Sequence, residues 1–321
     1  MSQLALFDDG NSGLDLAPVP DDVYTTAAAL PPAIRFGTMS WAYPGWIGPV
    51  YADHVRANQL VAHGLTAYAK HPLLRTVELD RTYYDALPAS YYQQLAAQVP
   101  SEFRFVAKAH EDCTTVRYPP HARYGARAGQ RNPRLLDAAY TTDHVIAPFV
   151  EGLGRKAGAL IFQFSPFEVR SPERFAGALH DFLRKLPRGP LYAVEVRNAE
   201  LMTAAYAEAI LDADAVHCHN AWGWLPDVVA QRALLATASQ RAFVARWLTR
   251  AGDSHEAARQ RYLPFDRLVE EDLDVRDDLT KLTREAIASN RDGFVLVANK
   301  AEGSAPETIR RLAASVVATA R

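Results

Sequence analysis

The sequence predicts an α/β protein with a closed (β/α)₈ TIM-type barrel, and three observations support this fold class. Eight short apolar runs recur along the chain, and helix-like segments separate most of them. The runs are nearly continuous in hydrophobicity, as expected of parallel strands that are covered on both faces. No G-x-G-x-x-G motif follows the first run, which disfavours the doubly wound open sheet, the main alternative. A single barrel also fits the length of 321 residues.

Each of the eight runs is rich in the β-branched and aromatic residues that favour strands. In chain order, the expected strands lie at residues 34–39, 75–80, 103–108, 158–164, 191–196, 214–220, 242–247 and 293–299.

Helical segments are expected between the strands. The first covers residues 58–71, and two later ones, 132–150 and 171–186, open with Asn-Pro and Ser-Pro, a cap residue followed by proline in the first turn. The last helix starts at Pro306, and helical spacing places four apolar residues on one of its faces: Ile309, Leu312, Ala313 and Val316.

Residues 1–33 differ from the rest of the chain. They mix acidic residues with Gly, Ser and Pro and show no sustained periodicity, which is typical of a flexible tail. We therefore expect a flexible tail over 1–33 and one barrel domain over 34–321.

The composition excludes several classes of protein. Lys plus Arg number 35 against 37 for Asp plus Glu, so overall charge gives no argument for nucleic acid or a membrane surface. No apolar stretch approaches the roughly 20 residues that span a bilayer, and the N-terminus lacks the order of a signal peptide. The two cysteines, Cys113 and Cys218, have no metal-ligand spacing. We expect a cytoplasmic protein with reduced thiols.

Candidate functional residues lie at the ends of the expected strands, because the active site of such a barrel forms at the C-terminal ends of its strands. These polar and aromatic residues are Thr38, Ser40, Trp41, Tyr43, Glu78, Asp80, Arg81, Tyr83, Lys108, His110, Gln163, Glu195, Arg197, Asn198, His217, His219, Asn220, Arg246, Asn299 and Lys300. In a core each polar group would need a partner, whereas around one rim they would form a polar bowl of mixed charge.

Two features of this set have alternative interpretations. Glu195 and Arg197 share one strand face and either face a pocket or form a structural ion pair. His217 and His219 also share a face, a spacing that a metal site can use together with Glu78 or Glu195, although satisfied structural histidines are the default.

Lys108 ends an otherwise apolar strand. A desolvated lysine can act as a base or a Schiff-base nucleophile, and more often it holds an anion or pairs with a carboxylate such as Glu78. The long loop 109–132 that follows carries Arg117, Arg123, Arg127 and Arg131, which makes it a candidate lid with groups suited to phosphate or carboxylate. The alternative is a solvated loop whose arginines pair with acidic residues.

Taken together, these strand ends resemble the domain-of-unknown-function-72 family, also called YecE-like. The matching elements are GTMSWAYPGW, TVELDRTYY, FRFVAK, IFQFSP, VEVRN and NKAEGSAP, and they cover the chain from about Ile34 to its end. The resemblance implies a TIM-type barrel and no established reaction. The family usually shows Asn where Asp80 stands, and often a paired Asn at Asn299 and Lys300, so Lys300 is able to balance the charge of Asp80.

The first of these elements crowds aromatic residues at a strand end. Its position favours Trp41 and Tyr43 as walls of a pocket, while Trp46 is equally able to lie under the first helix.

Residues Gln3 to Phe7 read QLALF, which resembles the peptide by which bacterial proteins bind the DNA polymerase sliding clamp. The resemblance implies that Leu4, Leu6 and Phe7 enter an apolar groove, while Gln3 forms hydrogen bonds. The alternative is an apolar tail that packs on the barrel.

Three functions remain open. The first is a metal-independent lyase, isomerase or hydrolase without a cofactor, acting on a small anionic substrate. In this function Glu195 is the general base, Lys108 and Arg197 hold the anion, and Glu78 is the orienting partner. The further substrate-binding candidates are Trp41, Tyr43, Gln163, Arg246 and Asn299.

The second function is a metal-dependent nuclease or phosphodiesterase with Glu78, Glu195, His217 and His219 as metal ligands. The third is a non-enzymatic accessory protein of the sliding clamp.

Overall fold

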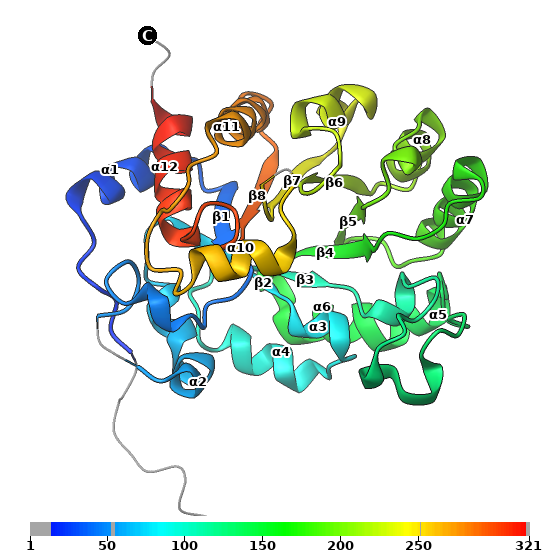
Figure 1. Ribbon diagram of the computed structural model, residues 1–321, viewed down its shortest axis with the longest axis horizontal. Coiled ribbons are helices and arrows are strands. Elements are labelled where there is room, and N and C mark those ends of the chain that lie inside the picture. The colour runs from blue at the N-terminus through cyan, green and yellow to red at the C-terminus, as the bar shows by residue number, and fades with distance from the viewer. Residues whose placement is uncertain (1–13, 53–54, 251, 319–321) are drawn as a thin grey trace, which may run out of the picture.

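The strands of the protein close into a parallel barrel (Figure 1). The computed structural model describes residues 14–52, 55–250 and 252–318. Each strand pairs with the next along the chain, and β1 pairs with β8 to complete the ring. The strands are β1 Ile34–Thr38, β2 Leu74–Leu79, β3 Arg104–Lys108, β4 Ala157–Phe164, β5 Leu191–Val196, β6 Val216–Ala221, β7 Ala242–Trp247 and β8 Asp292–Val297. The predicted (β/α)₈ fold class is confirmed.

Most helices lie around the strands (Figure 1). The helices are α1 Asp21–Ala29, α2 Ala57–Tyr68, α3 Arg81–Tyr84, α4 Ala89–Ala96, α5 Ala138–Thr141, α6 Ala147–Leu153, α7 Pro172–Arg184, α8 Ala204–Asp212, α9 Val228–Leu234, α10 His255–Tyr262, α11 Leu273–Ala288 and α12 Ala305–Val317. In the view of Figure 1, helix α10 lies over the middle of the barrel. Among the described helices, none combines the length and hydropathy needed to cross a bilayer.

One of the two predicted proline-containing helix starts is confirmed. Ser171 caps α7, with its hydroxyl accepting a hydrogen bond from the Arg174 N–H at 3.2 Å, and Pro172 follows in the first turn.

The start predicted at Asn132 is wrong. The Asn132 side chain donates to the carbonyls of Asp112 and Thr115, both at 2.8 Å, so it ties the preceding loop together instead of capping a helix. Helix α5 begins at Ala138, where Asp137 accepts the Tyr140 N–H at 3.0 Å.

The folded domain begins before the first strand. Helix α1 buries Val23 and Ala27 in the main core, and Asp22 pairs with Arg310 of α12 at 2.9 Å. The flexible tail predicted through residue 33 is therefore too long, because apolar residues of α1 find a partner surface. The QLALF segment lies outside the described residues, and its binding to a sliding clamp stays a prediction.

The filling of the barrel changes from apolar to charged toward the C-terminal ends of the strands. Alternate residues of each strand point inward, and an apolar layer inside the ring includes Val106, Ile161, Ala193, Cys218 and Val244. Two residues further along the same strands come Lys108, Gln163, Glu195, Asn220 and Arg246. Side chains two apart on a strand share a face, so these polar groups lie on top of the apolar layer and form the floor of the barrel mouth.

Candidate functional site at the barrel mouth

Arg246 of β7 is the centre of the polar layer. Its Nε and Nη2 donate to the two carboxylate oxygens of Glu78 at 2.9 and 2.8 Å, and its Nη1 donates to Glu195 and to Gln163 Oε1, the latter at 3.0 Å. A contact of 3.6 Å from Nη2 to the sulfur of Met39 engages the fifth N–H. Arg246 therefore has no donor left for a ligand, and this geometry favours a role in holding the two glutamates over the predicted role in substrate binding.

Glu195 of β5 connects Arg246 to Arg197. Its Oε1 accepts hydrogen bonds from Arg197 Nε and Asn220 Nδ2, both at 2.7 Å, and its Oε2 accepts one from Arg246. Gln163 joins the same group because its Oε1 also accepts Arg197 Nη2 at 3.1 Å. The two interpretations of Glu195 and Arg197 therefore both hold, since they form an ion pair and lie at the mouth.

Lys108 of β3 forms the solvent-side end of the network. Its Nζ pairs with Asp80 and lies 3.5 Å from Glu78 Oε1, and it stands 5.5 Å from the centre of the Tyr83 ring. The Lys108 side chain is buried, whereas that of Asp80 is 47% exposed. The structure thus brings Glu78, Lys108, Glu195 and Arg197 into one network, as the sequence predicts.

Burial and the neighbouring cations act against each other on Glu195. Burial disfavours its charged form, but the two guanidinium groups of Arg246 and Arg197 outweigh it and lower the pKa of Glu195 to about 2. The two carboxylates in turn raise the pKa of Arg246 despite its burial. Glu195 is therefore a fixed negative charge at neutral pH.

The aromatic residues after β1 divide into three positions. Trp46 is fully buried, stacks on Tyr68 of α2 and donates to Asn299 Oδ1 at 3.0 Å, so it belongs to the core. Tyr43 is half-buried near the mouth, where burial and then the charges of Asp80 and Glu78 raise its pKa. Trp41 lines a cleft beside the mouth. The geometry agrees with the predicted pocket positions of Tyr43 and Trp41.

That cleft has a volume of about 310 Å³ and lies between α2, α4 and the ends of β1 and β2. Besides Trp41, its lining includes Glu78, Asp80, Arg81 and Tyr91. It joins the charged floor to an apolar side wall, and so offers room for the uncharged part of a ligand.

Asn299, the predicted substrate-binding residue after β8, is turned toward the protein. Its Oδ1 accepts hydrogen bonds from Trp46 Nε1 and from the backbone N–H of Ala305 at 2.9 Å. This geometry favours a role in fixing the start of α12 against the loop after β1 over contact with a substrate.

The two histidines of β6 do not point at the mouth. His217 contacts Tyr206 and Gln231 at 3.0 and 3.1 Å, and His219 contacts Thr237 and the carbonyl of Val244 at 2.9 and 3.2 Å. Burial lowers the pKa of His217 to about 4 and holds that of His219 well below its ordinary value, so both rings are neutral at pH 7.

No group of three His, Cys, Asp or Glu side chains within the described ranges is arranged to hold a metal ion. The geometry therefore gives no support to a metal site built from Glu78, Glu195, His217 and His219. All four side chains form hydrogen bonds with other side chains of the protein.

The loop after β3 is held together by its own charges. The buried acids Glu111 and Asp112 pair with Arg123 and with Arg127 and Arg134, respectively. The guanidinium groups also lie over tyrosine rings, such as Arg127 over Tyr118 at 4.7 Å. For Arg123 and Arg127 the alternative of pairing with acidic residues is thus the observed one.

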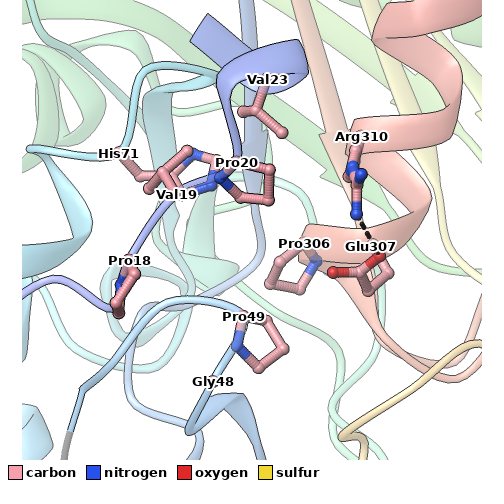
Figure 2. Close-up of a pocket in the computed structure, with 10 residues that line it drawn as sticks. All are labelled: Pro18, Val19, Pro20, Val23, Gly48, Pro49, His71, Pro306, Glu307 and Arg310. Atoms are coloured by element: carbon pink, nitrogen blue, oxygen red, sulfur yellow. Dashed lines mark ion pairs between the residues drawn. The ribbon is translucent and has the colours of Figure 1, made fainter.

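A second cavity, of about 270 Å³, lies between the N-terminal segment and α12 (Figure 2). None of the strand-end residues lines it. Its guanidinium, Arg310, is paired with Asp22 and lies 3.8 Å from Glu307, an ion pair drawn in the figure. Its histidine, His71, is buried, which lowers its pKa to about 4. This cavity presents no free charge, and the mouth is the stronger candidate.

Sequence reasoning named most of the mouth residues among the strand ends but missed Trp222. Asp80 and Tyr83 contact or face Lys108, and Trp222 lies under Arg197 with 4.9 Å between the guanidinium carbon and the ring centre. Lys300 follows β8 and lies close enough to Asp80 for their charges to interact. Asp80, Tyr83 and Lys300 could be found because they follow the ends of strands, whereas no sequence signal pointed to Trp222.

Comparison with known proteins identifies a family for this chain. The family described as "Protein of unknown function DUF72" matches residues 35–321. A DUF72 family protein from Enterococcus faecalis superposes with a TM-score of 0.59 at 16% identity, covering 90% of this chain and 97% of that one. A DUF72 family protein from Thermotoga maritima does so with a TM-score of 0.54 at 17% identity, covering 87% and 97%. No curated protein matches in sequence.

Proposed function

The chain belongs to the DUF72 (YecE-like) family, and we infer that it is an enzyme whose barrel mouth binds a small substrate carrying a phosphate or carboxylate group. The observation that carries this proposal is the buried network of Glu78, Glu195 and Arg246. Buried charges cost several kcal/mol each unless they are fully paired, and an apolar layer of the same volume would stabilise a barrel at least as well. The network lies on the face where barrels of this type carry out chemistry.

Arg197 is suited to hold the anionic group. Its Nε and Nη2 are bound to Glu195 and Gln163, while its Nη1 makes no hydrogen bond within the described part of the chain. Its side chain is 17% exposed and its guanidinium lies over the Trp222 ring, so the group is held in place before a ligand arrives. A fixed guanidinium binds phosphate and carboxylate with little further loss of entropy.

Asp80 and Lys108 are suited to transfer a proton. Glu195, which the sequence suggested as the general base, has no exposed surface, so a substrate cannot reach its carboxylate. The Asp80 carboxylate is half-exposed and touches the Lys108 ammonium, so a substrate can reach both. We therefore assign Glu195 and Glu78 to orientation of Arg197, Arg246 and Lys108, and acid–base chemistry to the Asp80–Lys108 pair.

A thermal-shift screen with phosphate- and carboxylate-bearing metabolites tests this function. At least one compound is expected to raise the Tm of the wild-type protein, and the Arg197→Met and Lys108→Met variants are expected to lose that shift. Lys281→Met, at an exposed lysine of α11, is the control and is expected to keep it. A wild-type protein that responds to no compound of either class would rule the proposal out.

A further inference from the structure

The segment 109–137, between β3 and α5, is basic although the whole chain is slightly acidic. It contains five arginines, no lysine and three acidic residues, whereas the chain has a formal net charge of −2. Two of the acids, Glu111 and Asp112, are buried, and the third, Asp137, caps α5. The surface of this segment therefore presents more positive than negative charge.

Two of the five arginines, Arg117 and Arg131, lie opposite each other on a short antiparallel hairpin, where they form an isolated β-bridge. The backbone hydrogen bond of 3.0 Å from the Tyr118 N–H to the Gln130 carbonyl flanks the bridge on one side, and one of 3.1 Å donated by the Asn132 N–H flanks it on the other. Arg117 and Arg131 are thus a non-hydrogen-bonded pair, the arrangement in which opposing side chains lie closest together.

This arginine pair points away from the protein. Tyr118 and Asn132, the next residues on the two sides of the hairpin, are each 3% exposed, and side chains alternate between the two faces of a strand. Arg117 and Arg131 therefore lie on the outer face, and both are exposed. Within the described ranges neither forms an ion pair with a carboxylate, and Arg117 donates only to the carbonyl of Gly129.

The fold gives no reason for this pair. Like charges directly opposite each other destabilise a hairpin. The buried carboxylate of Asp112 is taken up by other arginines of the segment, Arg127 at 3.5 Å and Arg134 at 3.2 Å. An external phosphate would neutralise both guanidinium groups of the pair through charge-assisted hydrogen bonds, which arginine forms in a fixed planar fork.

Further guanidinium groups beside the pair suit a partner with several phosphates. Arg127 and Arg134 lie over tyrosine rings, with 4.7 and 4.5 Å to the ring centres, and their side chains are 53% and 52% exposed. The ring under Arg127 is that of Tyr118, the neighbour of Arg117. The segment thus offers a series of fixed, accessible cations, where a single phosphorylated side chain would use only one position.

A membrane surface fits this segment less well than a nucleic acid does. Segments that bind in the membrane interface place apolar side chains beside their cations. In residues 109–137, all of which the structure describes, no large apolar side chain is exposed. Arginine without lysine, with guanidinium groups over aromatic rings, is instead typical of surfaces that contact phosphodiesters.

We propose that the segment 109–137 binds the phosphate backbone of a nucleic acid, with Arg117 and Arg131 as the principal contacts. The contacts are to phosphate, so binding shows little sequence preference. This surface is separate from the network of Glu78, Glu195 and Arg246 and goes beyond the function proposed for the barrel mouth.

Fluorescence anisotropy with a labelled DNA single strand and a labelled duplex, each about 20 nucleotides long, tests the proposal between about 50 and 200 mM salt. The wild-type protein is expected to bind at least one of them. The double variant Arg117→Ser, Arg131→Ser is expected to bind about tenfold or more weakly at the lower salt concentration. Its plot of log affinity against log salt is expected to be shallower by about 1.4 to 1.8, as loss of two phosphate contacts predicts.

Two matched variants accompany it. The double variant Arg155→Ser, Arg188→Ser loses the same charge at exposed arginines that precede β4 and β5, at the opposite end of the barrel, and is expected to bind within a few-fold of wild type. The double variant Arg117→Lys, Arg131→Lys keeps both charges and is expected to keep the wild-type salt dependence.

Thermal unfolding separates a binding role from a structural one. Removal of two opposed like charges relieves their repulsion, so the Tm of Arg117→Ser, Arg131→Ser is expected to equal or exceed that of wild type. A lower Tm would show that the pair supports the fold and would overturn the argument for an external anion.

Four binding outcomes would also overturn the proposal. They are a wild-type protein that binds neither DNA, a serine variant that binds as wild type does, and a control variant that is weakened as much as the serine variant. The fourth is binding, through the same two arginines, of phosphatidylserine vesicles or a phosphoserine peptide but not of DNA.

Discussion

Arg246 makes a buried charge layer tolerable at the end of an apolar barrel. Its fork of donors reaches Glu78 from one side of the ring and Glu195 from the other, so each carboxylate gains charge-assisted hydrogen bonds in place of water. A lysine would supply a single point of charge and could not satisfy both. These hydrogen bonds offset the desolvation of the buried charges only if the carboxylates stay ionised.

Acid should therefore destabilise the protein in a way that depends on Glu195. The pKa of Glu195 is about 2 in the folded protein, against 4.5 as its ordinary value. The unfolded chain takes up a proton below pH 4.5 that the folded protein does not accept until near pH 2, so stability is present above this window and is lost within it. The free energy of unfolding should fall more steeply with decreasing pH in wild type than in Glu195→Gln, and the extra slope should rise toward about 1.4 kcal/mol per pH unit below pH 4.5.

Urea unfolding of both proteins at pH 5.0, 4.5, 4.0 and 3.5 measures this difference in slope. Glu168→Gln, at a carboxylate with an exposed side chain, is the matched control. Parallel pH profiles for wild type and Glu195→Gln would show that the guanidinium groups do not hold the Glu195 charge as described.

At the same scale, the sequence could not decide which side chains of a strand point inward. Every residue of β6 is buried, and its polar residues His217, His219 and Asn220 fall on both faces of the strand, so neither polarity nor burial marks the face that points inward. His217 and His219 were therefore as plausible at the mouth as Asn220. The structure resolves this because Asn220 contacts Glu195 while both histidines contact groups on the helix side.

At the scale of elements, Gly37 allows β1 and β2 to meet. A Cβ at this position would lie 2.0 Å from the carbonyl oxygen of Thr76 and 2.6 Å from its Cγ2. The register of the β1–β2 pair also shifts between Phe36 and Gly37. The contact is between backbones, which cannot move aside as a flexible side chain can. Glycine is thus required for the strand spacing that carries Glu78 to Arg246.

Gly37→Ala should destabilise the protein by about 1–3 kcal/mol or more, because it overpacks a closed ring. The matched control is Gly177→Ala in α7, where nothing lies within 4 Å of the added methyl group. That substitution should stabilise by about 0.5–1 kcal/mol, since alanine loses less backbone entropy in a helix. Chemical denaturation of both variants checks the pair, and equal stability of the two would contradict the described closure.

Helix starts show how much local sequence decides. Ser171-Pro172 starts α7 as predicted, because the serine has no stronger partner than the free N–H of the first turn. The similar pair at Asn132 does not start a helix, because its amide binds two carbonyls of the preceding loop. A cap signal is thus reliable only where no tertiary partner competes for the same side chain.

At the scale of the molecule, the barrel gathers residues that are far apart in sequence. Glu78 and Arg246 are 168 positions apart and meet because β2 and β7 belong to one closed ring. The ring itself could be predicted, since eight buried strands in parallel leave few other arrangements. The sequence could not predict which polar side chains at the mouth already have all their hydrogen-bond donors engaged, because that depends on side chains from several strands at once. For that reason sequence reasoning chose Arg246 as a ligand-binding residue, although its donors are engaged by Glu78, Glu195 and Gln163.

Anomalous diffraction from crystals soaked in tungstate, an electron-dense analogue of phosphate, tests the central claim most directly. The account predicts an anomalous peak at the barrel mouth beside Arg197, and its loss when inorganic phosphate is added in excess. A mouth without a peak, in crystals where tungstate binds only elsewhere on the protein, would contradict the claim that this face of the barrel is an anion-binding site.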